Sequence, residues 1–136
     1  MISTGREAHD QRGASVSVLV AACLPAFALS CGLAVDGSAR LSAQREVTLA
    51  ASQAARAGSD SYAHSRLAGR PDAALAIAAA RASLSGFPAM TSDATVDAEG
   101  RLSVSVSTSV GTQFLSLVGI DHFTVRSRMT SDLRAS

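Results

Sequence analysis

A long uncharged stretch dominates the first third of the chain. No charged residue occurs between Ala14 and Val35, and Arg12 and Asp36 flank the stretch. As a helix it spans about 33 Å at 1.5 Å per residue, close to the hydrocarbon thickness of a bilayer. The pattern predicts a transmembrane helix over residues 14–35, preceded by a short disordered tail over residues 1–13.

Two features of this stretch leave alternatives open. Pro25 lies at its middle and predicts a kink, while abundant Ser and Ala favour close approach of partner helices, so both a kinked anchor and a helix-packing surface fit. The stretch is also only moderately hydrophobic. A cleaved signal peptide, with its cleavage point within residues 26–34, therefore remains a rival interpretation.

The helical pattern continues beyond the uncharged stretch. Apolar residues recur there at helical spacing, and few helix breakers intervene before Gly58. The residues of this stripe are Leu41, Val47, Ala50, Ala54 and Ala57. The pattern predicts a helical stalk over residues 36–58, with Gly58 as its C-terminal cap, followed by a loop over residues 59–71.

A second helix is predicted over Ala73–Ser85. Pro71 and Asp72 suit a helix start, because proline is favoured in the first turn and an acidic residue complements the helix dipole. Gly86 and Pro88 are expected to end it.

The period changes to two after this helix. Apolar residues alternate with serines from Leu102 to Val110, which predicts a strand with one buried face. We expect a preceding strand over 94–97 with a turn at 98–100, a third strand over 123–130, and a helical turn over 114–118 that ends at Gly119. The predicted fold class is α+β: a single N-terminal transmembrane helix that continues into the stalk helix, then a second helix packed on a small three-stranded antiparallel sheet. The small domain is expected over residues 72–131 and a tail over 132–136.

Composition and charge narrow the function classes. Hydrophobic residues make up 47% of the chain, but much of this is Ala, which argues against a large independent core. The net charge of +1 gives no basic face for nucleic acid. His9, His64 and His122 are not at metal-ligand spacing, and no nucleophile elbow or phosphate-binding glycine loop occurs. We therefore expect no enzyme activity, catalytic residue, metal, cofactor or small-molecule substrate.

Several segments resemble the TadE/TadG-like proteins of Flp-type tight-adherence pilus systems. The resemblance rests on the start of the chain and on the Ala-rich region, and it covers most of the chain. Its segments are Arg12–Val16, Leu24-Pro25, Gly32–Gly37 with Asp36-Gly37 at the membrane junction, Arg45, Ala50–Gly58, and Phe114–Ile120 before a strand, as in short actinobacterial members.

The resemblance implies a membrane-anchored, minor pilin-like or pilus-assembly component with a structural role. It implies a single-pass protein of the cell membrane, with a cytoplasmic N-terminus and an extracytoplasmic domain. The predicted transmembrane helix itself makes membrane lipid a partner. The resemblance adds the Tad-type membrane platform, pilin subunits and, indirectly, the assembly ATPase. The family's processing site maps to Gly13 and Ala14, but Val18 stands where the family has a glutamate five residues into the mature chain. That difference favours a permanently anchored, TadG-like assembly factor. The alternative is a secreted or surface-tethered binding module whose N-terminus is a cleaved export signal.

Overall fold

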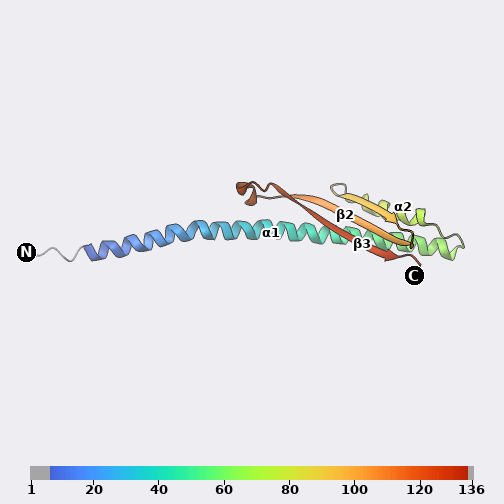
Figure 1. Ribbon diagram of the computed structural model, residues 1–136, viewed down its shortest axis with the longest axis horizontal. Helices are drawn as coiled ribbons and strands as arrows, with labels where there is room; N and C mark the ends of the chain where they lie inside the picture. Colours follow the sequence, from blue (N-terminus) through green and yellow to red (C-terminus); the bar gives the residue numbers. More distant parts are fainter. Residues whose placement is uncertain (1–6, 135–136) are drawn as a thin grey trace, which may run out of the picture.

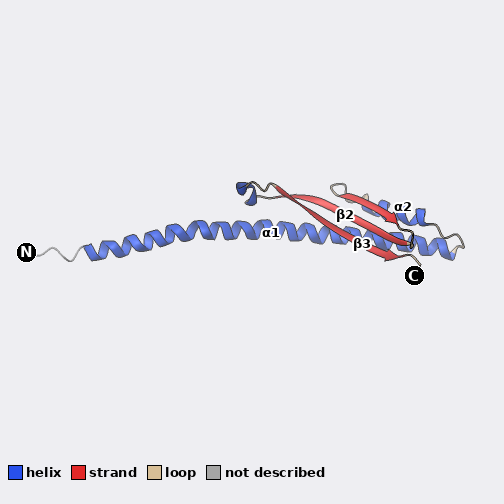
Figure 2. Cartoon of the chain, in the orientation of Figure 1, coloured by secondary structure: helices blue, strands red, loops and turns tan. Residues whose placement is uncertain are grey.

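The computed structural model describes residues 7–134 and confirms the α+β class (Figures 1 and 2). The described chain forms two α-helices and then a three-stranded antiparallel sheet, with a short 3-10 helix between the second and third strands. They are α1 (Glu7–Leu67), α2 (Ala73–Leu84), β1 (Thr91–Val96), β2 (Arg101–Gly111), η1 (Leu115–Val118) and β3 (His122–Asp132).

One helix, α1, runs the whole length of the molecule. It contains 61 residues, so it is about 90 Å long at 1.5 Å per residue. Its N-terminal part extends alone, and its C-terminal part carries α2 and the sheet (Figure 1). The helix continues through Pro25, and the extending part curves gently. Residues 7–13 belong to this helix, so the prediction of a disordered tail was wrong for them, and residues 1–6 lie outside the described residues.

The predicted end of this helix at Gly58 was wrong, and so was the loop predicted from residue 59. The helix runs on to Leu67 because Gly58 is a packing position rather than a cap. A Cβ atom there would lie 2.4 Å from Cδ2 of Leu102 and 2.9 Å from the carbonyl oxygen of Ala76. Gly69, with φ of +74°, follows the true helix end.

The turn between α1 and α2 is held by side chains from both sides. The Ser65 hydroxyl donates to the carbonyl of Tyr62 at 2.8 Å and accepts from the amide of Asp72 at 3.2 Å. Asp72 then caps α2 by accepting from the amide of Ala74 at 2.8 Å. The predicted start of the second helix is confirmed, and the helix ends at Leu84.

The sheet has the order β1-β2-β3 and is antiparallel throughout. The alternation predicted for residues 102–110 is confirmed: Leu102, Val104 and Val106 are buried, while the serines between them lie on the opposite face. The hairpin turn between β1 and β2 is also confirmed, with Gly100 at φ of +83°. The described part of the predicted tail is not separate, because β3 includes Asp132 and Leu133 is buried; residues 135–136 lie outside the described residues.

The core lies between the inner face of the sheet and the two helices. In α1 the buried stripe differs partly from the predicted one: Val47, Ala50 and Ala54 are fully buried, but Leu41 is 53% exposed. Ala43 takes the buried position in its place, because it precedes Val47 by one helical turn. The segment predicted as a stalk therefore supplies much of the domain core. The buried apolar residues are Ala43, Val47, Ala50, Ala51, Ala54, Ala55, Ala76, Ala80, Leu84, Ala94, Leu102, Val104, Val106, Val125 and Leu133.

Candidate functional site

The extending part of α1 is apolar and almost wholly exposed. An 18-residue stretch of the helix has a mean hydropathy of 2.3, and 6% of it is buried. The core helix of a soluble protein of this composition would be mostly buried. Among the described residues, α1 is therefore the one helix long and apolar enough to cross a membrane, although an export signal has the same character. Its exposed large side chains include Val16, Val18, Leu19, Val20, Leu24, Phe27, Leu29, Leu33 and Val35.

Asp36 marks the point at which the exposed part of α1 meets the rest of the protein. The side chain is buried, with 2% exposure, and its carboxylate accepts three backbone hydrogen bonds from the connection between β2 and β3. Oδ1 accepts from the amide of Gln113 at 2.9 Å, and Oδ2 accepts from the amides of Phe114 at 3.0 Å and Leu115 at 2.8 Å. Because η1 begins at Leu115, the carboxylate of one helix caps the first turn of another.

These hydrogen bonds decide the charge state of Asp36. The bond from Gln113, followed by those from Leu115 and Phe114, lowers the pKa of the Asp36 carboxyl below the usual aspartate value, although burial opposes the shift. The carboxylate is therefore charged at neutral pH, and its charge is compensated by amide dipoles.

Gly32, one turn before Asp36, provides the second contact with the same connection. It is buried, and a Cβ atom at this position would lie 2.5 Å from Cγ and Cδ1 of Phe114. The absence of a side chain at Gly32 thus lets the Phe114 ring lie directly against the helix backbone. Sequence reasoning missed this pairing. The only available signal was the spacing of a glycine and an aspartate by four residues on one helix face.

The other predicted site residues lie apart from this junction. A Cβ atom added at Gly37 would have no neighbouring atom within 4 Å, so Gly37 is not a packing glycine. Gly13 and Ala14, the candidate processing site, lie in the helical backbone of α1. Of the two predicted junction residues, Asp36 and Gly37, whose side-chain positions the structure describes, only Asp36 contacts the sheet domain.

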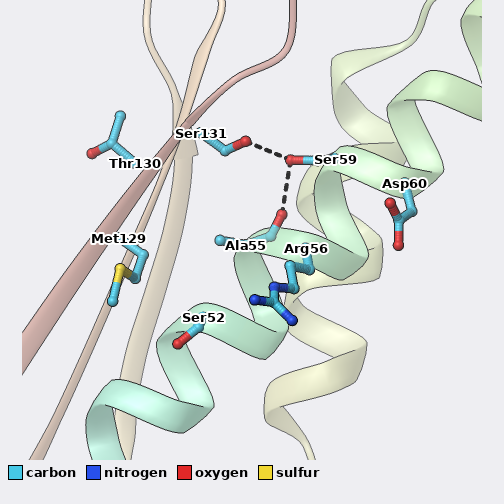
Figure 3. Close-up of a pocket in the computed structure, with 8 residues that line it drawn as sticks. All are labelled: Ser52, Ala55, Arg56, Ser59, Asp60, Met129, Thr130 and Ser131. Carbon is cyan, nitrogen blue, oxygen red and sulfur yellow. Dashed lines mark hydrogen bonds between the residues drawn. The ribbon is translucent and has the colours of Figure 1, made fainter. Parts of the chain in front are cut away.

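A shallow groove runs between α1 and β3, on the side of the molecule shown in Figure 3. Its volume is about 450 Å³. The Ser59 hydroxyl donates to the carbonyl of Ala55 at 2.9 Å and pairs with the Ser131 hydroxyl at 2.7 Å, as the dashed lines show. Both hydroxyls are therefore engaged in joining the helix to the strand. The residues lining the groove are Ser52, Ala55, Arg56, Ser59, Asp60, Met129, Thr130 and Ser131.

Metal-ligating side chains are scattered. Over the part of the chain that the structure describes, no three or more His, Cys, Asp or Glu side chains form a group that could hold a metal ion. His64 is bonded through Nδ1 to the carbonyl of Asp60 at 2.8 Å, within its own helix. Cys23 and Cys31 are exposed on α1 and unbridged.

Comparisons with protein-family models, with curated proteins and with solved structures find no match for this chain.

Proposed function

We propose that this protein is a membrane-anchored structural component in which residues 14–35 cross the bilayer and the sheet domain lies at the membrane surface. One observation carries the proposal: the exposed apolar part of α1 continues without a break into the helix at the centre of the domain. An anchor and a domain that share one helix form a single rigid body, which suits a part of an assembly better than a flexibly tethered module.

The contacts at the junction favour retention of the anchor over its removal during export. Cleavage within residues 26–34 would cut α1 beside Gly32 or before it. Gly32 would then be removed or left within the first few residues of the mature chain, so both the surface on which the Phe114 ring packs and Asp36 would belong to a missing or fraying helix end. An export signal has no reason to contribute to the fold of the mature domain in this way.

The specific setting that we propose is a Tad-type pilus or secretion apparatus. The support is the resemblance of the chain to TadE/TadG-like proteins and the order of its parts: anchor, Asp36-Gly37 junction, Ala-rich helix and small β-rich domain. In this role the N-terminus lies in the cytoplasm and the domain outside. The partners are the membrane platform, pilin subunits and, through the platform, the assembly ATPase.

Membrane extraction of two arginine variants tests the anchor. Leu24 and Leu67 are both exposed leucines of α1, but only Leu24 lies in the uncharged stretch. Arginine at the centre of a membrane helix costs about 2.5–3.5 kcal/mol on insertion scales. We expect the native chain and Leu67→Arg to resist carbonate extraction with an intact N-terminal half, and Leu24→Arg to be extracted. A native chain that is soluble in the medium and begins near Asp36 would establish the secreted alternative instead.

A deletion strain tests the pilus assignment separately. We expect loss of surface pili, restored by the native gene and by Leu67→Arg but not by Leu24→Arg. Normal piliation in the deletion strain would refute the Tad assignment while leaving the anchor intact.

A further inference from the structure

The connection between β2 and β3, residues 112–121, carries an exposed apolar tip. The large side chains of this tip project away from the core: Leu117 is 80% exposed, Val118 70%, Ile120 47% and Phe114 41%. From residue 112 to residue 120 the sequence contains no charged residue. Exposed apolar clusters of this kind mark contacts with a membrane or with another protein.

The tip is held in place by hydrogen bonds at both ends. On one side the Asp36 carboxylate fixes its first amides. On the other side the amide of Thr112 donates to the carbonyl of Asp121 at 2.9 Å, and the amide of Ile120 donates to the carbonyl of Leu115 at 3.0 Å. The exposed side chains are therefore presented by an ordered turn.

The position of the tip along α1 decides what surrounds it. Phe114 lies against Gly32, which is inside the uncharged stretch, and the tip's backbone is bound to Asp36, the first charged residue after it. Gly32 and Asp36 are about 6 Å apart along the helix axis. The tip thus lies beside the last turn of the proposed membrane span, at the level where the span leaves the hydrocarbon layer.

The backbone of the tip is suited to the interfacial layer of a bilayer. Each free amide costs several kcal/mol in hydrocarbon, and lipid-exposed irregular backbone does not occur there, so the tip fits the interface, where most of its amides are paired and water can reach the rest. Most amides of the tip donate hydrogen bonds within the protein. The donors are the amides of Thr112, Gln113, Phe114, Leu115, Leu117, Gly119 and Ile120.

We propose that the tip of the β2–β3 connection inserts into the interfacial layer of the bilayer next to α1, as a second membrane contact that fixes the tilt of the domain. The occupant of this surface is lipid, on the ground that the tip is continuous with the proposed span. The inference rests on the proposed membrane anchor. The protein is then held in the bilayer at two points, along α1 and at Leu117 and Val118, so its rotation about the axis of α1 is restricted.

The chain contains no tryptophan, so single tryptophans report on their own surroundings. Three exposed positions serve as probes of the full chain reconstituted in phosphatidylcholine–phosphatidylglycerol vesicles: Phe27→Trp in the proposed span, Leu117→Trp at the tip, and Leu67→Trp at the far end of α1. Lipids brominated in the upper part of the acyl chain quench only tryptophans that contact lipid. We expect blue-shifted and quenched emission for Phe27→Trp and Leu117→Trp, and red-shifted, unquenched emission for Leu67→Trp.

The three probes separate failure of the inference from failure of the anchor. An unquenched Phe27→Trp refutes the membrane anchor itself. A quenched Phe27→Trp with a red-shifted, unquenched Leu117→Trp refutes the tip insertion alone. Leu117→Trp emission that is blue-shifted but unquenched also refutes it, because the tip is then covered by protein, such as a second copy of this chain.

Discussion

Gly58 in α1 and Leu102 in β2 are in direct contact, with no space for a side chain at position 58. A Cβ atom there would lie 2.4 Å from Cδ2 of Leu102, and the carbonyl oxygen of Ala76 in α2 lies 2.9 Å from the same point. Three elements of the domain thus meet at one glycine. Any side chain at position 58 would push α1, α2 and the sheet apart.

Substitution of this glycine by alanine is expected to destabilise the domain. Overpacking of a close contact typically costs about 1–3 kcal/mol, of which roughly 1 kcal/mol is regained from the higher helix propensity of alanine. Tyr62 packs against the core and is the single tyrosine of a chain without tryptophan, so its fluorescence reports domain unfolding in detergent solution. We expect a lower melting temperature for Gly58→Ala.

Gly37→Ala is the matched control, because it makes the same change in the same helix where no atom lies within 4 Å. Its expected effect is a gain of about 0.5–1 kcal/mol or no change. If both variants lowered the melting temperature equally, the loss would reflect the helix in general and not the contact with Leu102.

The local elements of the fold were predictable because their signals are local. The alternation from Leu102 to Val110 defines a half-buried strand by itself, and Gly100 and Gly119 mark turns where the structure has φ of +83° and +86°. Gly58 misled the prediction, since a glycine after a helical pattern usually ends the helix. What overrides that tendency is contact with residues distant in sequence, which no local pattern contains.

Removal of the Asp36 carboxylate is expected to loosen the β2–β3 connection. In Asp36→Ala the amides of Gln113, Phe114 and Leu115 lose their acceptor, and η1 loses its cap. Hydrogen exchange should become faster at these three amides and remain unchanged at Val104 and Val106, in the middle of the sheet. Unchanged exchange at the three amides would show that the cap does not hold the turn.

The lowered pKa of Asp36 implies that the stability of the β2–β3 connection depends on pH in a defined direction. Because the folded-state pKa of Asp36 is lowered, its contribution to stability is fully present above the usual aspartate pKa and is lost as the pH falls through the folded-state value. Protection factors at Gln113–Leu115 should therefore stay constant from neutral pH to the usual aspartate range and fall below it.

Two variants test whether Asp36 is the group whose titration changes the protection of the β2–β3 connection. Asp36→Asn should have lower protection with no titration in this range. The pKa of Asp97 is also lowered, chiefly by the backbone hydrogen bond from Arg101, but this residue lies in the β1–β2 turn. Asp97→Asn should therefore leave the pH profile of the β2–β3 connection unchanged. A profile that followed Asp97 would assign the effect to global unfolding.

The hydrogen bond between the Ser59 and Ser131 hydroxyls, shown in Figure 3, is expected to stabilise the protein by joining α1 to the edge strand β3. Ser59 and Ser131 lie 72 positions apart and are joined at 2.7 Å. A double-mutant cycle with Ser59→Ala and Ser131→Ala should give a coupling of about 0.5–1.5 kcal/mol, because the cycle cancels the change in helix propensity at Ser59. Ser105→Ala, on the outer face of β2, should change stability by less than about 0.5 kcal/mol. Additive effects of the two serine substitutions would mean that the hydroxyls contribute independently.

The sequence predicted one part of the candidate site, Asp36, but not the backbone groups that it binds. Asp36 was recognisable as the first charge after an uncharged stretch, but its role depends on amides 77 to 79 positions further along the chain. The apolar residues from Phe114 to Val118 were predicted correctly as a helical turn that ends at Gly119. Their exposure was not foreseeable, because apolar residues at helical spacing normally indicate a buried helix face.

Gly32 and the Phe114 ring are in contact at the junction, so a larger residue at position 32 should be compensated by a smaller residue at position 114. In Gly32→Ala the new Cβ would lie 2.5 Å from the Phe114 ring, which is 41% exposed and therefore free to swing outward. We expect faster hydrogen exchange at Phe114 and Leu115 with little change in the melting temperature, since the buried core is untouched. In Gly32→Ala combined with Phe114→Ala the clash is removed, so the helix and the tip should approach again, and exchange at Leu115 should return toward that of Phe114→Ala alone. If Gly32→Ala accelerated exchange equally in both backgrounds, the glycine would act through the helix itself and not through its contact with the ring.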